Sequence, residues 1–175
     1  HVRMEEYLLS VVPAESRASW PLETLKAQAV AARTYALYQK LHRVQLAWDL
    51  VDDTGDQMYS GVGREHARTT AAVRDTTGKV LLYGGRPILS QYMANSGGRV
   101  ASSADIFGVD KPYLVALQDP ASLEGSMGSW SRRHGTAEIE SALRARGFEV
   151  RGLRDIRPLE RGQCGRIIRV RLVAD

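Results

Sequence analysis

Glu15 is the residue of this chain whose type and surroundings best suit acid–base chemistry. It follows the apolar residues 7–12 and precedes a long alanine-rich segment. A carboxyl group held against apolar side chains has its charged form disfavoured, so its pKa rises and it carries a proton near neutral pH. A group in that state can act as a general acid. The sequence therefore favours an enzyme with Glu15 at its centre.

Two helices are predicted to position this carboxyl group. Residues 4–12 have the apolar spacing of one helix face. Pro13 lacks an amide hydrogen, so we expect the helix to end there and Glu15 to lie in the turn that follows. The second helix is expected to begin near Ser19 and to end near Leu41. Its predicted core stripe consists of Leu22, Leu25, Ala29, Ala32 and Ala36.

The rest of the chain mixes shorter helices and strands without a regular alternation. Further helices are predicted at 65–76 and 136–146, and strands at 57–60, 79–83, 87–94, 148–157 and 166–173. The strands at 79–83 and 87–94 are expected to form a hairpin around two glycines and an arginine. Residues 99–135 read as loop-rich, with 122–130 the most flexible part. This pattern predicts an α+β fold, with a mixed or antiparallel sheet packed against a central alanine-rich helix.

Composition indicates a globular protein and narrows its partners. The 175 residues suit one domain, 1–175, with a sizeable core. The sequence contains no apolar run of 18 residues, so no membrane span is expected. A net charge of +4 favours acidic partners such as an anionic cell-wall polymer. Nucleic acid is disfavoured, because the arginines are scattered rather than gathered on one helix face. A single cysteine, Cys164, excludes an internal disulfide and a thiolate metal cluster.

Four groups of residues, taken in order, carry a resemblance to a known family. They are VVPAES and LKAQAVAARTYAL within 7–37, DQMYSG at 56–61, YMANSGGRVASSADIFGVDKPYL at 92–114 and GRIIRVRLV at 165–173. Together they resemble the SpoIID/LytB domain, the sporulation stage II protein D family of peptidoglycan lytic transglycosylases. The chain ends before the last segment usual in that family, so we expect a domain shortened at its C-terminal end.

The resemblance implies both a substrate and a mechanism. Glu15 occupies the glutamate of the family's V-V-x-x-E motif, which makes it the expected catalytic acid and base. The expected substrate is the peptidoglycan glycan strand, cut between MurNAc and GlcNAc to leave a 1,6-anhydroMurNAc end. The resemblance also implies a location outside the cytoplasm, in the cell envelope or secreted, and a cell-wall amidase as a candidate partner.

Five further residues are predicted to bind the substrate. Arg33 lies near the edge of the apolar stripe of the second helix, where its guanidinium can orient Glu15 or bind a sugar carboxylate; a solvated helix arginine is the alternative. Tyr92 and Ser96 share a face of a predicted strand and precede Gly97 and Gly98. They can line a sugar cleft, although a core position is an equal alternative for Tyr92.

No metal or cofactor is predicted. Some family members carry a cysteine and histidine cluster before the Q-V-Y stretch, but Val51, Gly55 and Asp56 stand at those positions here. Thiolate ligands are therefore absent. The aspartates of residues 49–56 read as a solvated acidic loop rather than a cation site.

Two other classes of function remain open from the sequence. The first is a non-catalytic module that binds peptidoglycan or enhances an amidase. The second is a hydrolytic muramidase, in which Glu15 works with a second carboxylate such as Asp105. The products separate these possibilities: anhydro ends for a transglycosylase, reducing ends for a hydrolase, and neither for a binding module.

Overall fold

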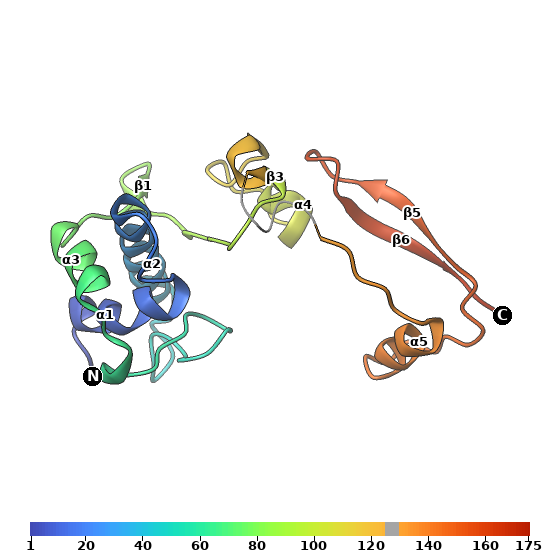
Figure 1. The fold of residues 1–175 in the computed structure, drawn as a ribbon, viewed down its shortest axis with the longest axis horizontal. Helices are drawn as coiled ribbons and strands as arrows, with labels where there is room; N and C mark the ends of the chain where they lie inside the picture. The colour runs from blue at the N-terminus through green and yellow to red at the C-terminus, as the bar shows by residue number, and fades with distance from the viewer. Residues whose placement is uncertain (125–129) are drawn as a thin grey trace. The chain divides into compact units, whose positions relative to one another are not determined.

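Helices dominate the first half of the chain and the longer strands lie in the second half, which confirms the α+β class (Figure 1). The computed structural model describes residues 1–124 and 130–175. The chain divides into two compact units, residues 1–92 and 93–175. Residues 125–129 of the loop predicted to be most flexible lie outside the described residues.

The first unit is built from helices α1 (Met4–Glu15), α2 (Leu22–His42) and α3 (Ala67–Asp75), which pack against one another (Figure 1). Helix α2 has Glu23 in its first turn and Lys40 in its last turn, as its dipole favours. Its alanines leave room for α1 and α3 to approach. Within the described residues, every helix is too short or too polar to cross a bilayer.

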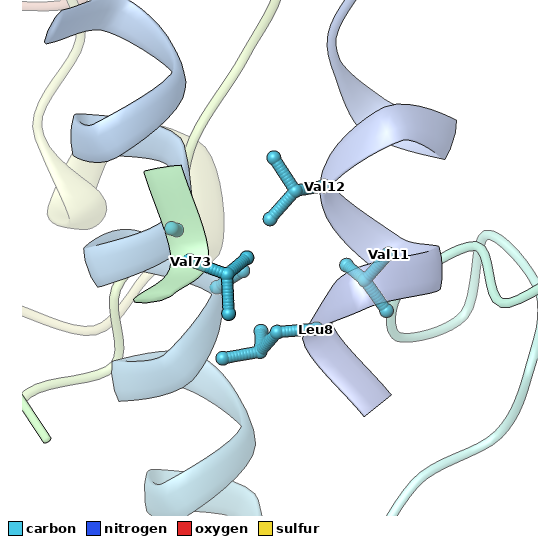
Figure 2. Packing of buried hydrophobic residues seen from close by; sticks show 6 residues of the cluster. Leu8, Val11, Val12 and Val73 are labelled. Carbon is cyan, nitrogen blue, oxygen red and sulfur yellow. The ribbon is translucent and has the colours of Figure 1, made fainter. Parts of the chain in front are cut away.

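The core of this unit is a cluster of fully buried aliphatic side chains. Figure 2 shows Leu8 and Val12 pointing from α1 toward Val73 of α3. Ala29 and Ala32 of α2 complete the contact as small residues between the larger ones. Each large aliphatic side chain buried in this way contributes about 1.5–3 kcal/mol to folding. The cluster fixes α1 on α2, and so fixes where α1 ends.

Two expectations about these helices were wrong. Helix α1 continues through Pro13 and ends at Glu15, so Glu15 is the last helical residue rather than part of a following turn. Proline at this position removes one backbone hydrogen bond close to the end of a helix whose preceding turn is anchored in the core. The Ser16 N–H then closes the helix on the Val12 carbonyl at 2.9 Å. Leu22 is 37% exposed and does not belong to the core stripe.

The segment predicted as a strand at 57–60 runs without strand pairing along α1. Its backbone bonds are made to other partners: the Tyr59 N–H to the Asp52 carbonyl at 3.2 Å, and the Ser60 N–H to Ser10 Oγ at 3.1 Å. The short helix η1 (Val62–Arg64) follows. Side-chain and loop contacts, rather than a sheet, therefore place this segment beside Glu15.

The predicted hairpin is present but short. Strand β1 (Leu82–Tyr83) pairs antiparallel with β2 (Arg86–Pro87), and Gly84 and Gly85 turn the chain with φ of 57° and 75°. Only glycine adopts such angles readily. Strand β2 contacts α2, so this hairpin packs on the alanine-rich helix alongside α1 and α3. The residues after 87, expected to extend the second arm, form no strand.

The second unit carries the remaining strand pairs. Strand β3 (Gly98–Val100) pairs antiparallel with β4 (Leu117–Asp119), and β5 (Asp155–Arg161) pairs antiparallel with β6 (Ile167–Val173). The last strand agrees with the prediction, whereas β5 begins seven residues later than expected from the predicted 148–157. Among the described residues the strands thus pair two by two, each time antiparallel.

Short helices fill the rest of this unit. They are α4 (Ser103–Phe107), η2 (Pro120–Leu123) and α5 (Thr136–Arg144). Helix α5 confirms the prediction at 136–146, while α4, η2 and β4 lie inside the region expected to be loop-rich. Ser102 caps α4 by accepting a hydrogen bond from the Asp105 N–H at 3.2 Å, a local signal that the prediction overlooked.

Candidate active site

The Glu15 carboxylate is held at the end of α1 by the chain segment that passes beside it. Its Oε1 accepts a hydrogen bond from the Met58 N–H at 2.9 Å. The side chain is half-buried, so part of the carboxylate faces open space. A backbone donor fixes the orientation of the carboxylate without adding a charge, because the peptide group is neutral.

Glu15 lines a pocket of about 300 Å³ in the first unit. The other lining residues are Tyr35, Thr54, Gly55, Asp56, Met58, Ser90, Gln91 and Tyr92. Most of them carry hydroxyl, amide or carboxylate groups, as a site for a hydroxyl-rich ligand needs. Of these, the sequence pointed to Glu15 and Tyr92, and the structure brings these two together.

Gln57 links Tyr92 of the pocket to Tyr7 of α1. Its side chain is 1% exposed, and its Nε2 donates to the Tyr92 hydroxyl at 3.1 Å and to the Ala32 carbonyl at 3.3 Å. Its Oε1 accepts a hydrogen bond from the Tyr7 hydroxyl at 3.2 Å. A buried amide with donors and acceptor all engaged is a rigid support. Sequence reasoning missed this role, although Gln57 stands in the DQMYSG segment.

Tyr92 is bound to Gln57 and lines the same pocket as Glu15. Burial raises the pKa of Tyr92, the hydrogen bond from Gln57 lowers it, and the charge of Glu15 together with a hydrogen bond to that carboxylate raises it. Burial likewise raises the pKa of Tyr7, with further contributions from neighbouring acidic groups. Both phenols therefore stay protonated at physiological pH.

Asp56, the other carboxylate of the pocket, is fully engaged by neighbours. Its side chain is 0% exposed and pairs with Arg43 through two hydrogen bonds of 2.5 and 2.8 Å. The Val51 N–H and the Tyr35 hydroxyl each donate to it at 2.8 Å. Burial alone would raise the pKa of Asp56, but the hydrogen bonds from Arg43, Val51 and Tyr35 and the Arg43 charge outweigh burial and lower it. The expectation that Asp56 belongs to a solvated loop was wrong.

The comparisons with known proteins bear on this helical unit and its pocket. The Stage II sporulation protein family, SpoIID, matches residues 1–83, which include Glu15, Asp56 and Met58. Residues 1–83 of the chain thus resemble the SpoIID family, as the sequence motifs predicted. Tyr92 lies beyond the matched residues.

The chain is also similar to individual proteins of two bacteria. The chain is 39% identical over 114 residues to an uncharacterized protein of Brachyspira hyodysenteriae, covering 65% of this chain and 31% of the relative. It is 39% identical over 112 residues to the Amidase enhancer of Bacillus subtilis, covering 64% and 15%. It is 31% identical over 137 residues to the Stage II sporulation protein D of Bacillus subtilis, covering 69% and 39%. The chain thus spans well under half of each relative.

Arg33 has a different partner from the one expected. Its guanidinium is 3% exposed and forms two hydrogen bonds of 2.8 Å with the Glu5 carboxylate. It also donates to the carbonyls of Val73 and Lys79, each at 3.2 Å. The hydrogen bond from Arg33 lowers the pKa of Glu5. The structure therefore replaces the expected contact with Glu15 by a junction of α1, α2 and the end of α3.

Ser96, Gly97 and Gly98 lie in the second unit and build a tight turn there. Ser96 is 4% exposed, and its Oγ donates to Asp119 at 2.5 Å and lies 2.9 Å from Ser122 Oγ. The Gly98 N–H donates to the same Ser122 Oγ at 2.7 Å. The two glycines have φ of 63° and 87°. Ser96 and Tyr92 do not share a strand face, which corrects that prediction, and the Ser96 hydroxyl serves the turn.

Asp105, considered as a second catalytic carboxylate, is also part of the second unit. Its Oδ2 accepts a hydrogen bond from the Gln163 N–H at 2.7 Å, which ties α4 to the β5–β6 connection. Within the described residues, no group of histidine, cysteine, aspartate and glutamate side chains has the arrangement of a metal site.

Proposed function

We propose that this SpoIID domain is a peptidoglycan lytic transglycosylase in which Glu15 acts as both general acid and general base. The observation that supports this most is the difference in hydrogen bonding between the two pocket carboxylates, Asp56 and Glu15. Asp56 accepts four hydrogen bonds and pairs with Arg43. Within the part of the chain that the structure describes, Glu15 forms no ion pair, so the pocket offers one carboxylate to a ligand.

A single available carboxylate favours a transglycosylase over a hydrolase. Glycoside hydrolases use two carboxyl groups, the second as nucleophile or as the base that activates water. A transglycosylase needs no second carboxylate, because the attacking group is the C6 hydroxyl of the MurNAc residue itself. That hydroxyl arrives with the substrate in the correct geometry, which replaces an activated water by an intramolecular nucleophile.

The proposed reaction uses one proton donor and returns it to its starting state. Protonated Glu15 gives its proton to the glycosidic oxygen as the bond from that oxygen to MurNAc C1 breaks, and GlcNAc leaves with a free hydroxyl. The C6 hydroxyl then attacks C1, and the Glu15 carboxylate takes the hydroxyl proton. The products are a 1,6-anhydroMurNAc end and a shortened strand, and no water is consumed.

The neighbours of Glu15 suit both halves of this cycle. The Met58 N–H at 2.9 Å stabilises the carboxylate that forms after proton transfer. Tyr92, fixed by Gln57, lines the pocket beside Glu15. Because the Met58 N–H is a neutral donor, it orients the carboxylate without the permanent charge of an arginine or lysine.

The relatives set the biological context of the proposal. Their names, Stage II sporulation protein D and Amidase enhancer, suggest a protein of cell-wall remodelling that acts outside the cytoplasm. We propose that the glycan strand is the ligand and that a cell-wall amidase is a candidate partner. The chain covers 39% of one of these relatives and 15% of the other, so the partner belongs to this proposal and not to the comparison.

The decisive experiment is the substitution Glu15→Gln, which keeps the shape of the side chain and removes its acid function. Loss of a general acid lowers rates by about 10²–10⁴-fold, so anhydro ends should fall by at least about a hundredfold. The assay is mass spectrometry of purified glycan strands, both intact and denuded of stem peptides, after digestion. Glu65→Gln, on an exposed residue of the same unit, is the control. Wild-type yields of anhydro ends from Glu15→Gln would overturn the assignment.

A non-catalytic module is the second candidate, favoured by the relative named Amidase enhancer. In that case the wild-type chain releases neither anhydro nor reducing ends. It instead sediments with insoluble peptidoglycan and raises the rate of an added amidase. Glu15→Gln would leave both of these properties unchanged, which separates the two candidates in one set of samples.

A further inference from the structure

The loop between α2 and the Glu15 pocket has little regular structure of its own. Residues 44–55 connect the end of α2 to Asp56, and they contain neither helix nor strand. Short turns order them locally, such as the Leu46 N–H to the Arg43 carbonyl at 3.0 Å and the Asp56 N–H to the Asp53 carbonyl at 3.1 Å. Turns of this kind join residues that are close in the sequence. They do not hold the two ends of the loop together, so a contact between Arg43 and Asp56 has to do so.

We infer that the part-buried Arg43–Asp56 ion pair fixes the two ends of this loop, and that Asp56 is a positioning residue for Glu15. The inference rests on the proposed function of Glu15. Arg43 follows the last residue of α2, and Asp56 lies just before the segment that contacts Glu15. The pair therefore joins the two ends of the loop. We call it the Arg43–Asp56 clamp.

Every acceptor position of the Asp56 carboxylate is used inside the fold. Oδ1 accepts from Arg43 Nη2 and the Tyr35 hydroxyl, both at 2.8 Å. Oδ2 accepts from Arg43 Nη1 at 2.5 Å and the Val51 N–H at 2.8 Å. A carboxylate saturated in this way has no lone pair directed at a ligand. Although it lines the pocket, Asp56 acts on the site through its neighbours.

Arg43 supports the loop at a further point. Its Nη1 also donates to the Asp49 carbonyl at 3.2 Å, in the middle of the loop. On the other side of the clamp, Tyr35 accepts a hydrogen bond from Gln39 at 2.8 Å, which ties the clamp to one face of α2. The planar guanidinium that grips both carboxylate oxygens gives a fixed geometry, which lysine cannot reproduce.

Three successive residues transmit this geometry to the catalytic group. Asp56 is bound to α2 through Arg43, Gln57 supports Tyr92, and the Met58 N–H holds Glu15 at 2.9 Å. The peptide units between them are planar and short, so a shift of Asp56 moves the Met58 N–H. A misplacement of about 1 Å in a catalytic constellation costs about a hundredfold in rate. The clamp thus sets the position from which Glu15 meets the glycosidic oxygen.

The test combines a spectroscopic and a kinetic measurement on the full chain. The amide proton shift of Met58, measured by ¹H–¹⁵N NMR, reports its hydrogen bond to Glu15, and Glu15→Gln provides the reference for a weakened bond. In Asp56→Asn we expect the Met58 shift to move toward that reference, with kcat about a hundredfold lower and KM changed far less. In Arg43→Lys we expect an intermediate shift and an intermediate kcat. Asp52→Asn, an exposed residue of the same loop, is the control and should match the wild type.

The outcomes separate this inference from the proposed function. If the wild-type chain makes no anhydro ends, the proposed function fails, and the Met58 shift still tests whether the clamp positions Glu15. If Asp56→Asn does not fold, Arg43→Lys decides. A wild-type Met58 shift and wild-type kcat in Arg43→Lys and Asp56→Asn would overturn the inference. So would a raised KM with unchanged kcat, because that result places Asp56 in direct contact with the substrate.

Discussion

Replacing Arg33 by methionine tests whether this buried arginine supports the fold or the substrate. The guanidinium joins α1, α2 and α3 through the Glu5 carboxylate and the carbonyls of Val73 and Lys79. Methionine fills a similar space without any donor. We expect Arg33→Met to unfold more easily while the Glu15 pocket keeps its lining residues, since Arg33 is not among them.

The magnitude follows from the exposure of the two partners. Removing one member of a fully buried ion pair costs about 3–5 kcal/mol. Arg33 is 3% exposed but Glu5 is 38% exposed, so water solvates part of the carboxylate left behind and the loss lies at the lower end. The two carbonyls that lose their donor add to the loss, about 1 kcal/mol or more each where water cannot reach. We therefore expect the free energy of unfolding to fall by about 3–5 kcal/mol.

Urea unfolding followed by far-ultraviolet circular dichroism measures this quantity, because the helices of the first unit dominate the signal. Arg74→Met, on an exposed position of α3, is the matched control and should change the free energy of unfolding by less than about 0.5 kcal/mol. The reasoning is refuted if Arg33→Met has wild-type stability and has lost binding to peptidoglycan. That result would assign Arg33 to the substrate site, as the sequence first suggested.

Two further predictions concern acid stability and the turn of the second unit. The pKa of Glu5 is lowered in the fold, so its stabilising effect is present above its unfolded value of about 4.3 and is lost as pH falls through the folded value. The difference in unfolding free energy between wild type and Glu5→Gln should therefore narrow between pH 6 and pH 3, and a constant difference would contradict this. Gly98→Ala combines a φ of 87° with a Cβ placed 3.1 Å from Leu123 Cδ1, and should destabilise by about 1–3 kcal/mol in thermal unfolding. Gly135→Ala, with an ordinary φ and open space, should be neutral.

The helices could be predicted because their signals are local. Apolar spacing and alanine content located α1 and α2, glycines marked the ends of α3 and α5, and two glycines located the β1–β2 turn. The end of α1 could not be predicted from Pro13 alone, since the core contacts of the preceding turn hold the helix together beyond the proline. Residues 57–60 read as a strand for a related reason. Their extended backbone is stabilised by single contacts with α1 and the preceding loop, and sequence pattern does not distinguish these from a sheet.

The candidate site was predictable where a motif marks it and not where the pairing is long-range. The surroundings of Glu15 and the family resemblance both identified Glu15. The acidic residues before Met58 looked solvated, because nothing local shows that Arg43 folds back over Asp56. For Arg33 the sequence predicted a ligand contact, whereas the structure has a buried ion pair. A position at the edge of a helix's apolar stripe is compatible with both. The contact with Glu5 of α1, which the sequence pattern does not show, decides between them.

The two corrections together favour the proposed chemistry. A guanidinium beside a general acid would form an ion pair with its carboxyl group and compete with the glycosidic oxygen for that group. In this fold Arg33 is bound to Glu5 and Arg43 is bound to Asp56, so both guanidiniums are neutralised by other carboxylates. Glu15 accepts instead from the Met58 N–H, a neutral donor that orients it. Arg33 was expected to contact Glu15. It instead joins the helices, and in that position it supports the proposed mechanism better.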